Sequence, residues 1–187
     1  MYYTGVGPRQ IPQDVYDRLY RLGAFLGSLG WVLRSGGADG ADTAFEKGAD
    51  SVGGQKEIYL PWKRFNKNPS SLFEVTPAAI EASLRFHPTA HLITKHGVRC
   101  IMGRNLYQVL GQTMDTPSKF LVTWTPYSTM DALNHGKKIG GTGQAIRIAD
   151  HYRVPLYNLS EGDDFESLHE DLQSGLLSQR PDPPVRD

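Results

Sequence analysis

The sequence predicts an α/β fold built on a parallel sheet, and three observations carry this prediction. Short runs of β-branched and aromatic residues alternate with longer stretches in which apolar residues recur at helical spacing, which is typical of strands joined by crossover helices. Residues 119–124 contain a continuous apolar run, as expected for a central strand buried on both faces. Glycine-rich segments at residues 35–40 and 140–143 each directly precede a helical stripe. We therefore expect a single Rossmann-like domain with helices on both faces of the sheet.

The N-terminal half of the chain predicts three strands and two helices. The helical stripe of Val15, Leu19, Leu22 and Leu26 is followed by Gly30, a residue that commonly ends helices. In chain order, we expect a strand at Tyr2–Val6, a helix at 12–29, a strand at 31–34, a helix at 41–48 with a small-residue face, and a strand at 57–60 that stops at Pro61.

The C-terminal half continues the alternation. Thr76 and Pro77 have the pattern of an N-cap followed by proline at the first helical position. After that helix we expect a longer helix at 98–111, the central strand at 119–124, a helix at 145–152, a strand at 154–159 and a short helix at 165–177. Residues 178–187 are rich in proline and charge and are expected to form a mobile tail, so the predicted domain spans residues 1–177.

Composition narrows the functional classes. The 187 residues include 20 Lys and Arg against 20 Asp and Glu, and this neutrality argues against a nonspecific nucleic-acid binder, which usually carries a basic excess. Cys100 is the only cysteine and is expected to be a buried thiol. The six histidines lack metal-binding spacing, so we expect no metal and no cofactor. Without a signal peptide or an apolar stretch of about 18 residues, we expect a cytoplasmic protein that does not enter a membrane.

The two glycine-rich segments are candidates for a phosphate site. Parallel sheets bind ligands at the carboxyl ends of their strands, and a helix N-terminus there attracts anions through its unpaired N–H groups. Ser35 and Thr142 offer hydroxyls to the same oxygens, and residues 135–138 (His-Gly-Lys-Lys) add positive charge. The alternative is that strand-to-helix turns need glycine for backbone reasons alone. Two such segments, with Gly5 and Gly7 after the first strand, favour a ligand site. Neither is a P-loop, and an ordinary NAD-binding motif is absent.

Several side chains near these segments have two interpretations. Asp39 lies inside the first turn and is a candidate for a ribose hydroxyl, whereas Asp42 fits a helix N-terminus. Arg104 is either a phosphate ligand or a solvated residue. Asn105 falls on the apolar stripe and is expected to be buried and hydrogen-bonded, although it is also a candidate to read a base. Trp124 either stacks on a base or closes the core.

These motifs together resemble those of the SLOG superfamily, which includes the Smf/DprA DNA-processing proteins, the LOG-type nucleotide phosphoribohydrolases and small stand-alone members, some of them from bacteriophages. The motifs are residues 3–7, residues 34–42, the Arg104-Asn105 pair and residues 140–145. The resemblance implies a Rossmann-like fold, a site for nucleotides or nucleotide-derived signals, and frequent homodimers, for which the stripe at 98–111 is long enough. It also implies that residues 35–40 and 140–143 contact phosphate and that Arg104-Asn105 corresponds to an Arg-Asn pair of the DprA branch.

The sequence departs from the phosphoribohydrolase pattern at one informative place. Those enzymes carry Pro-Gly-Gly-x-Gly-Thr-x-x-Glu, whose glutamate serves hydrolysis, whereas residues 139–146 read Ile-Gly-Gly-Thr-Gly-Gln-Ala-Ile. Gln144 cannot act as a general acid or base. The resemblance therefore favours holding a nucleotide over cleaving one.

Three functions follow, in order of preference. The first is binding, or sequestration, of a phosphate-bearing nucleotide or nucleotide-derived signal. The second is DprA-like binding of single-stranded DNA, with Lys63, Arg64, Lys67, Lys137 and Lys138 as phosphate partners. The third is N-glycosidic hydrolysis with Asp39, Asp42 or Glu46 in place of the missing glutamate. We assign no catalytic residue. The candidate ligand-binding residues are Gly5, Gly7, Arg9, Ser35, Gly36, Gly37, Asp39, Gly40, Arg104, Asn105, Trp124, Gly140, Gly141, Thr142 and Gln144.

Overall fold

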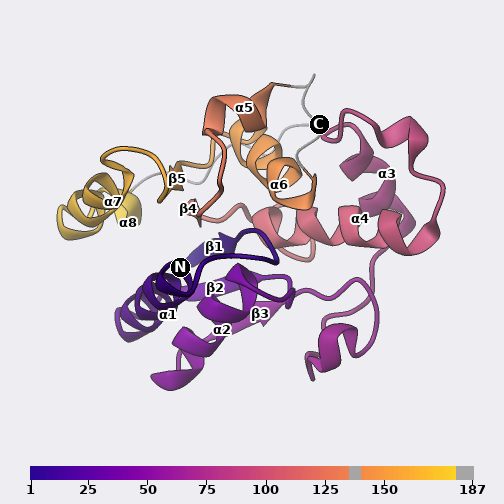
Figure 1. Cartoon of the computed structure of the whole chain (residues 1–187). Helices are drawn as coiled ribbons and strands as arrows, with labels where there is room; N and C mark the ends of the chain where they lie inside the picture. Colours follow the sequence, from indigo (N-terminus) through magenta and orange to yellow (C-terminus); the bar gives the residue numbers. More distant parts are fainter. Residues whose placement is uncertain (135–139, 180–187) are drawn as a thin grey trace.

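The computed structural model describes residues 1–134 and 140–179 and has the predicted α/β architecture (Figure 1). A single sheet holds five parallel strands in the order β3-β2-β1-β4-β5, with β1 paired to both β2 and β4. This is a Rossmann-like strand order. The strands are β1 (Tyr2–Val6), β2 (Val32–Ser35), β3 (Lys56–Ile58), β4 (Phe120–Thr123) and β5 (Leu156–Asn158).

Helices cover both faces of the sheet, as the alternation predicts. On one face, α1 (Gln13–Ser28) and α2 (Ala41–Ser51) pack with α7 (Asp164–Gln173) and α8 (Leu176–Gln179). On the other face, α4 (His96–Leu110) packs with α6 (Gly140–His151). Shorter elements are η1 (Phe65–Lys67), α3 (Pro77–Leu84), η2 (Ala90–Leu92) and α5 (Thr129–Leu133).

The core lies on the two faces of the central strands. Phe120 and Val122 point into the cluster formed with α1 and α2, whereas Leu121 between them points into the cluster formed with α4 and α6. All three side chains are fully buried, so the prediction of a central strand buried on both faces is confirmed. Alternate residues of one strand thus hold two helical layers in register.

Several element boundaries differ from the sequence prediction, and three of these differences are informative. The third strand ends at Ile58, although Tyr59 still donates a backbone hydrogen bond to the Ser35 carbonyl (2.9 Å). The predicted helix at 165–177 is two helices, because Gly175 between them has φ +71°, which an α-helix does not continue through. Of the predicted tail, residues 178 and 179 end α8. Residues 180–187 and the basic residues at 135–138 lie outside the described residues.

The second glycine-rich segment is placed differently from the prediction. Residues 140–143 form the first turn of α6, and they do not directly follow a strand. The unpredicted helix α5 intervenes after β4, and its start is stabilised by Ser128, whose hydroxyl accepts a hydrogen bond from the Asp131 amide (3.0 Å). The glycines still present a helix N-terminus at the carboxyl edge of the sheet. None of the helices in the described part of the chain is long and apolar enough to cross a membrane.

Candidate functional site

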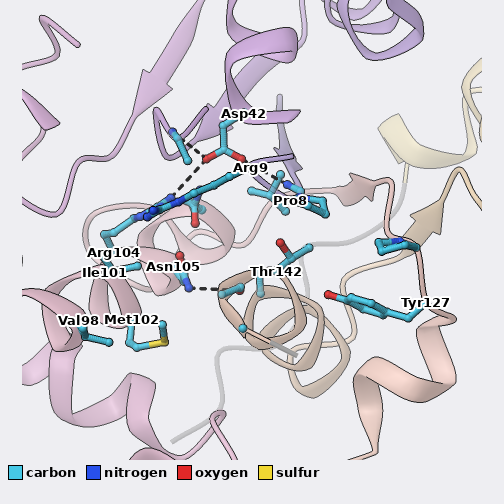
Figure 2. Close-up of a pocket in the computed structure, with 18 residues that line it drawn as sticks. Pro8, Arg9, Asp42, Val98, Ile101, Met102, Arg104, Asn105, Tyr127 and Thr142 are labelled. Carbon is cyan, nitrogen blue, oxygen red and sulfur yellow. Dashed lines mark hydrogen bonds and ion pairs between the residues drawn. The ribbon is translucent and has the colours of Figure 1, made fainter. Parts of the chain in front are cut away.

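A cavity of about 450 Å³ opens at the carboxyl edge of the sheet (Figure 2). Its walls come from the loop after β1, the loop after β2, the start of α2, one face of α4, the loop after β4 and the start of α6. Seven predicted ligand residues line it, and they come from three separate parts of the sequence. They are Gly7, Arg9, Arg104, Asn105, Gly140, Gly141 and Thr142.

At the centre of the cavity wall, Arg104 pairs with Asp42 (Nη1 to Oδ2, 3.6 Å). Both residues are almost fully buried, at 5% and 2% exposure, so the alternative of a solvated Arg104 is wrong. Asp42 also accepts hydrogen bonds from the backbone amides of Gly7 and Ala38 (both 3.3 Å). The Asp42 carboxylate therefore ties together the loops after β1 and β2, a role that its position in the first turn of α2 does not indicate.

The electrostatics of this pair are dominated by burial. Burial raises the pKa of Asp42, and Arg104 and the backbone amides act in the opposite direction. Burial also lowers the pKa of Arg104, and the nearby positive charge of Arg9 lowers it further. A guanidinium nevertheless stays charged at any ordinary pH. Figure 2 shows Arg9 running alongside Arg104. The cavity wall thus carries two guanidinium groups, Arg9 and Arg104, against the single carboxylate of Asp42, which leaves it with an excess positive charge.

The cavity also holds polar hydrogens without partners. Within the described residues, Arg104 Nε and Gln108 Nε2 are buried atoms with no hydrogen-bond partner, and both side chains line the cavity. Buried donors in native proteins are nearly always satisfied, so such atoms call for a ligand or an ordered water. The first N–H groups of α6 add donors of the same kind, because a helix leaves them without intrahelical acceptors. The wall is therefore built to accept an anionic or acceptor-rich group.

Asn105 and Gln144 form a buried amide link beside this wall. Asn105 Nδ2 donates to Gln144 Oε1 (2.7 Å) and to the Gly141 carbonyl (3.3 Å), and Gln144 Nε2 donates to the Ser83 carbonyl (2.8 Å). The prediction that Asn105 is buried and hydrogen-bonded is confirmed. Gln144 is fully buried and does not line the cavity. The pair instead fixes the first turn of α6 against α4.

The other predicted residues lie behind the cavity or away from it. Ser35 is fully buried, and its hydroxyl donates to the Gly5 carbonyl (2.7 Å), so it joins β2 to β1. Asp39 is exposed and does not line the cavity. Trp124 packs against the core cluster on the α1–α2 face, in agreement with its core-closing interpretation. Three glycines, Gly36, Gly37 and Gly40, shape the loop: Gly37 and Gly40 have φ of +62° and +76°, and Gly36 lies directly under the Arg104 guanidinium.

The apolar wall of the cavity was not predicted from the sequence. Val98, Ile101 and Met102 of α4 line one end of the cavity, and Tyr127, from the loop after β4, lines the other, with Thr142 of α6 between them in the view of Figure 2. Burial raises the pKa of Tyr127 to about 12, so its hydroxyl stays neutral at physiological pH. These α4 residues recur at helical spacing, but residues buried in a core recur at the same spacing, so the sequence did not distinguish a cavity wall from a core. Cys100 on this helix is a buried free thiol, as predicted, and burial raises its pKa.

Comparison with known proteins supports the fold and leaves the family open. No protein-family model and no curated protein sequence matches the chain. Among solved structures, the chain resembles DNA processing protein A from Helicobacter pylori, described for its unique mode of binding single-stranded DNA, with a TM-score of 0.52 and 17% sequence identity. The likeness covers 95% of this chain and 79% of that one. The protein therefore has a Rossmann-like fold similar to that of DNA processing protein A.

Proposed function

We propose that the protein binds single-stranded DNA and holds one nucleotide unit in the cavity at the carboxyl edge of the sheet. The observation that carries this proposal is the division of the cavity into a cationic side and an apolar side. Its volume of about 450 Å³ is within the range of small-molecule sites. The fold resemblance to a protein described as binding single-stranded DNA supports the same assignment.

The phosphate of that nucleotide is placed on the cationic side. Arg9 is exposed and belongs to the cavity wall, so its guanidinium is accessible to a phosphate oxygen. Thr142 and the glycine amides at the start of α6 approach the same space, and a helix N-terminus favours an anion there. Arg104 contributes charge from behind while remaining paired with Asp42.

The base is placed on the apolar side. Ile101 and Met102 offer an aliphatic surface, and Tyr127 offers a ring on the opposite side. Such contacts accept any base, since every base has an apolar face. The Gln108 amide nitrogen, which has no hydrogen-bond partner among the described residues, is assigned to an acceptor on the sugar or base edge.

A free nucleotide, or a signal derived from one, is the second candidate. The formal net charge of zero favours it, because long nucleic acids are usually bound by proteins with a basic excess. Hydrolysis has less support, because none of the three carboxylates considered as its catalytic group is both free and in the cavity wall. Asp42 is committed to Arg104 and two amides, Asp39 is outside the cavity wall, and Glu46 pairs with Lys56 (2.9 Å).

The two candidates are separated by the dependence of affinity on ligand length and salt. Fluorescently labelled oligothymidylates of one to eight nucleotides are titrated with the protein at two salt concentrations. Single-stranded DNA binding predicts affinity that rises with length and falls with salt, with a slope of about −0.7 per phosphate contacted. A free-nucleotide receptor instead binds a mononucleotide as tightly as the octamer. Absence of binding to every ligand in the series contradicts both candidates.

Arg9→Ala is expected to weaken oligothymidylate binding about 10- to 100-fold, since hydrogen bonds to charged groups contribute about 1.5–3 kcal/mol. Arg9 is exposed, so the free energy of unfolding should change by no more than about 0.5 kcal/mol. Fluorescence anisotropy and urea denaturation measure the two quantities. Arg153→Ala, at an exposed site after α6, is the matched control. Equal losses of affinity in the two variants would show that only overall charge matters.

A further inference from the structure

Next to the cavity, residues 62–73 (loop 62–73) display an exposed aromatic ring and a cluster of cations. Trp62 is 44% exposed, although large aromatic side chains are usually buried. Lys63, Arg64 and Lys67 are also exposed, and with Phe73 they line a second cavity of about 290 Å³. Trp62 itself does not line this second cavity, but it precedes Lys63 directly in the chain. Exposed aromatic rings beside cations are the elements from which proteins build binding surfaces for single-stranded nucleic acids.

The positive charge of loop 62–73 is not neutralised locally. Within residues 1–134 and 140–179, none of Lys63, Arg64 and Lys67 forms an ion pair. The nearest aromatic contact is that of Lys63 Nζ, 5.9 Å from the centroid of the Phe73 ring. Elsewhere, Lys56 has two carboxylate partners and Arg34 has one. The three cations of the loop are therefore available to an external anion.

The loop holds these cations in a fixed and strained conformation. Arg64, Asn66 and Lys67 have left-handed φ of 60°, 49° and 61°, a region that side chains other than glycine rarely adopt. Such strain persists only where the surroundings hold it, and it concentrates at binding sites.

Two groups of contacts hold the loop in place. Asn66 Nδ2 donates to the Gly37 carbonyl (3.1 Å), and the Ser70 hydroxyl donates to the Ile58 carbonyl (2.6 Å). Phe65 at the centre of the loop is buried in the core cluster of the α1–α2 face. The loop is thus fastened to β3 and to the glycine-rich turn after β2, and its cations are presented from a rigid base.

Loop 62–73 also adjoins the cavity directly. The Arg9 guanidinium, which lines the cavity, lies 5.8 Å from the centroid of the Phe65 ring. Phe65 in turn meets Trp62 edge to face, with ring centroids 5.1 Å apart. A Cβ atom added to Gly97 would lie 3.5 Å from Trp62 Cζ3. Gly97 directly precedes Val98, which lines the cavity. Arg9, Phe65 and Trp62 therefore form a continuous border between the cavity and the loop.

We propose that loop 62–73 is a second nucleotide subsite, in which a base stacks on Trp62 and the adjoining phosphates lie on Lys63, Arg64 and Lys67. This inference rests on the proposed binding of single-stranded DNA and names the path of the strand, from the cavity across Arg9 onto Trp62. Along this path the strand would meet Arg9 at the cavity and then Lys63, Arg64 and Lys67 on the loop. With this second subsite, the protein binds a strand more tightly than a single nucleotide, although its formal net charge is zero.

The test measures affinities for a thymidine hexanucleotide and for thymidine 5′-monophosphate in the same variants. Trp62→Ala is expected to weaken hexanucleotide binding about 5- to 100-fold, because stacking of one base on an aromatic ring is worth about 1–3 kcal/mol. Binding of the monophosphate, which occupies the cavity, should be unchanged. Trp62→Phe keeps an aromatic face and should retain most of the hexanucleotide affinity.

The charges are tested by the double variant Arg64→Asn, Lys67→Asn. Asparagine tolerates left-handed φ, so the change removes two charges without adding backbone strain. The slope of log affinity against log salt concentration for the hexanucleotide should become shallower by about 1.4, which is about 0.7 for each phosphate that the variant no longer neutralises. Arg153→Asn is the matched control, because Arg153 is also exposed and also has a left-handed φ, of 55°. The control should leave the slope unchanged.

The outcomes separate this inference from the proposed function. Hexanucleotide affinity that is unchanged in both the Trp62→Ala and the double variant overturns the subsite while DNA binding stands. Equal losses of affinity for the hexanucleotide and the monophosphate also overturn the second subsite, because loop 62–73 would then influence binding only through its effect on the cavity. A wild-type protein that binds no oligonucleotide overturns the proposed function, and the subsite with it.

Discussion

Replacement of Arg104 by alanine is expected to lower the free energy of unfolding by about 3–5 kcal/mol, because it leaves the buried Asp42 carboxylate without its cationic partner. Asp42 is 2% exposed and cannot recover its hydration without opening the loops after β1 and β2. The two amide hydrogen bonds from those loops remain, but they do not compensate for the missing positive charge. Urea denaturation followed by circular dichroism measures the loss.

The double variant Asp42→Ala, Arg104→Ala separates the cost of an unpaired charge from the loss of side-chain packing. If the unpaired carboxylate dominates, the double variant is more stable than Arg104→Ala alone, although two interactions are missing from it. Arg153→Ala, at an exposed site, controls for the removal of one arginine and should cost no more than about 0.5 kcal/mol. A double variant less stable than both single variants would contradict the proposed dominance of the charge.

The pH dependence of the Arg104→Ala variant gives an independent check. Burial raises the pKa of Asp42, and the removal of Arg104 takes away an interaction that opposes this rise. Asp42 therefore binds its proton more tightly in the folded variant than in the unfolded chain. As the pH rises from the ordinary aspartate pKa of about 4 through the raised pKa of the folded state, the variant loses unfolding free energy. The deficit relative to the wild type should shrink as the pH is lowered toward that range. A constant deficit between neutral and acidic pH would show that Asp42 stays ionised.

The fold was predictable because it depends on periodicity, which is local. The alternation of strands and helical stripes, and the continuous apolar run around Leu121, were enough to place the central strand and the helices on both faces. The unpredicted helix α5 is only five residues long and carries no stripe. Its N-cap at Ser128 is a short-range signal that becomes visible only once the flanking elements are known.

The site was only partly predictable because its contacts join residues that are distant in sequence. The glycine-rich segments and Arg104 stood out as unusual, and the structure brings several of them to one cavity. The pairing of Arg104 with Asp42 and the border between Arg9 and Phe65 depend on how the loops fold over the sheet edge. No local pattern distinguishes the cavity-lining Ile101 from a core residue with the same spacing.

Gly36 illustrates how the structure changes the interpretation of a motif. The sequence places it in a phosphate-contacting loop, where a missing side chain lets the ligand approach the backbone. In the structure, a Cβ on Gly36 would lie 1.3 Å from Arg104 Nη1 and 2.4 Å from Gln108 Nε2. Its φ is not left-handed, so the backbone itself would accept alanine. The glycine is required here because the Arg104 guanidinium occupies the space of its side chain.

Gly36→Ala is therefore expected to displace Arg104 into the cavity, with two measurable consequences. Overpacking should cost about 1–3 kcal/mol of unfolding free energy, and the loss of the ion pair with Asp42 should add to this cost. The displaced guanidinium should also occupy the space assigned to the nucleotide, so oligothymidylate binding should fall below detection at concentrations that saturate the wild type. Denaturation and anisotropy titration measure the two effects on the same preparations.

The same substitution should change sign when Arg104 is absent. In the Arg104→Ala background the nearest obstacle is removed, and the Gln108 amide, which has no hydrogen-bond partner among the described residues, is free to turn away. Alanine then restricts the unfolded chain without a clash and should be neutral or stabilising by about 0.4–1 kcal/mol. The resulting non-additivity of Gly36→Ala and Arg104→Ala identifies the guanidinium as the group that requires glycine. Additive losses in the double variant would instead mean that Gly36 is required by the backbone of the turn, as the motif alone suggested.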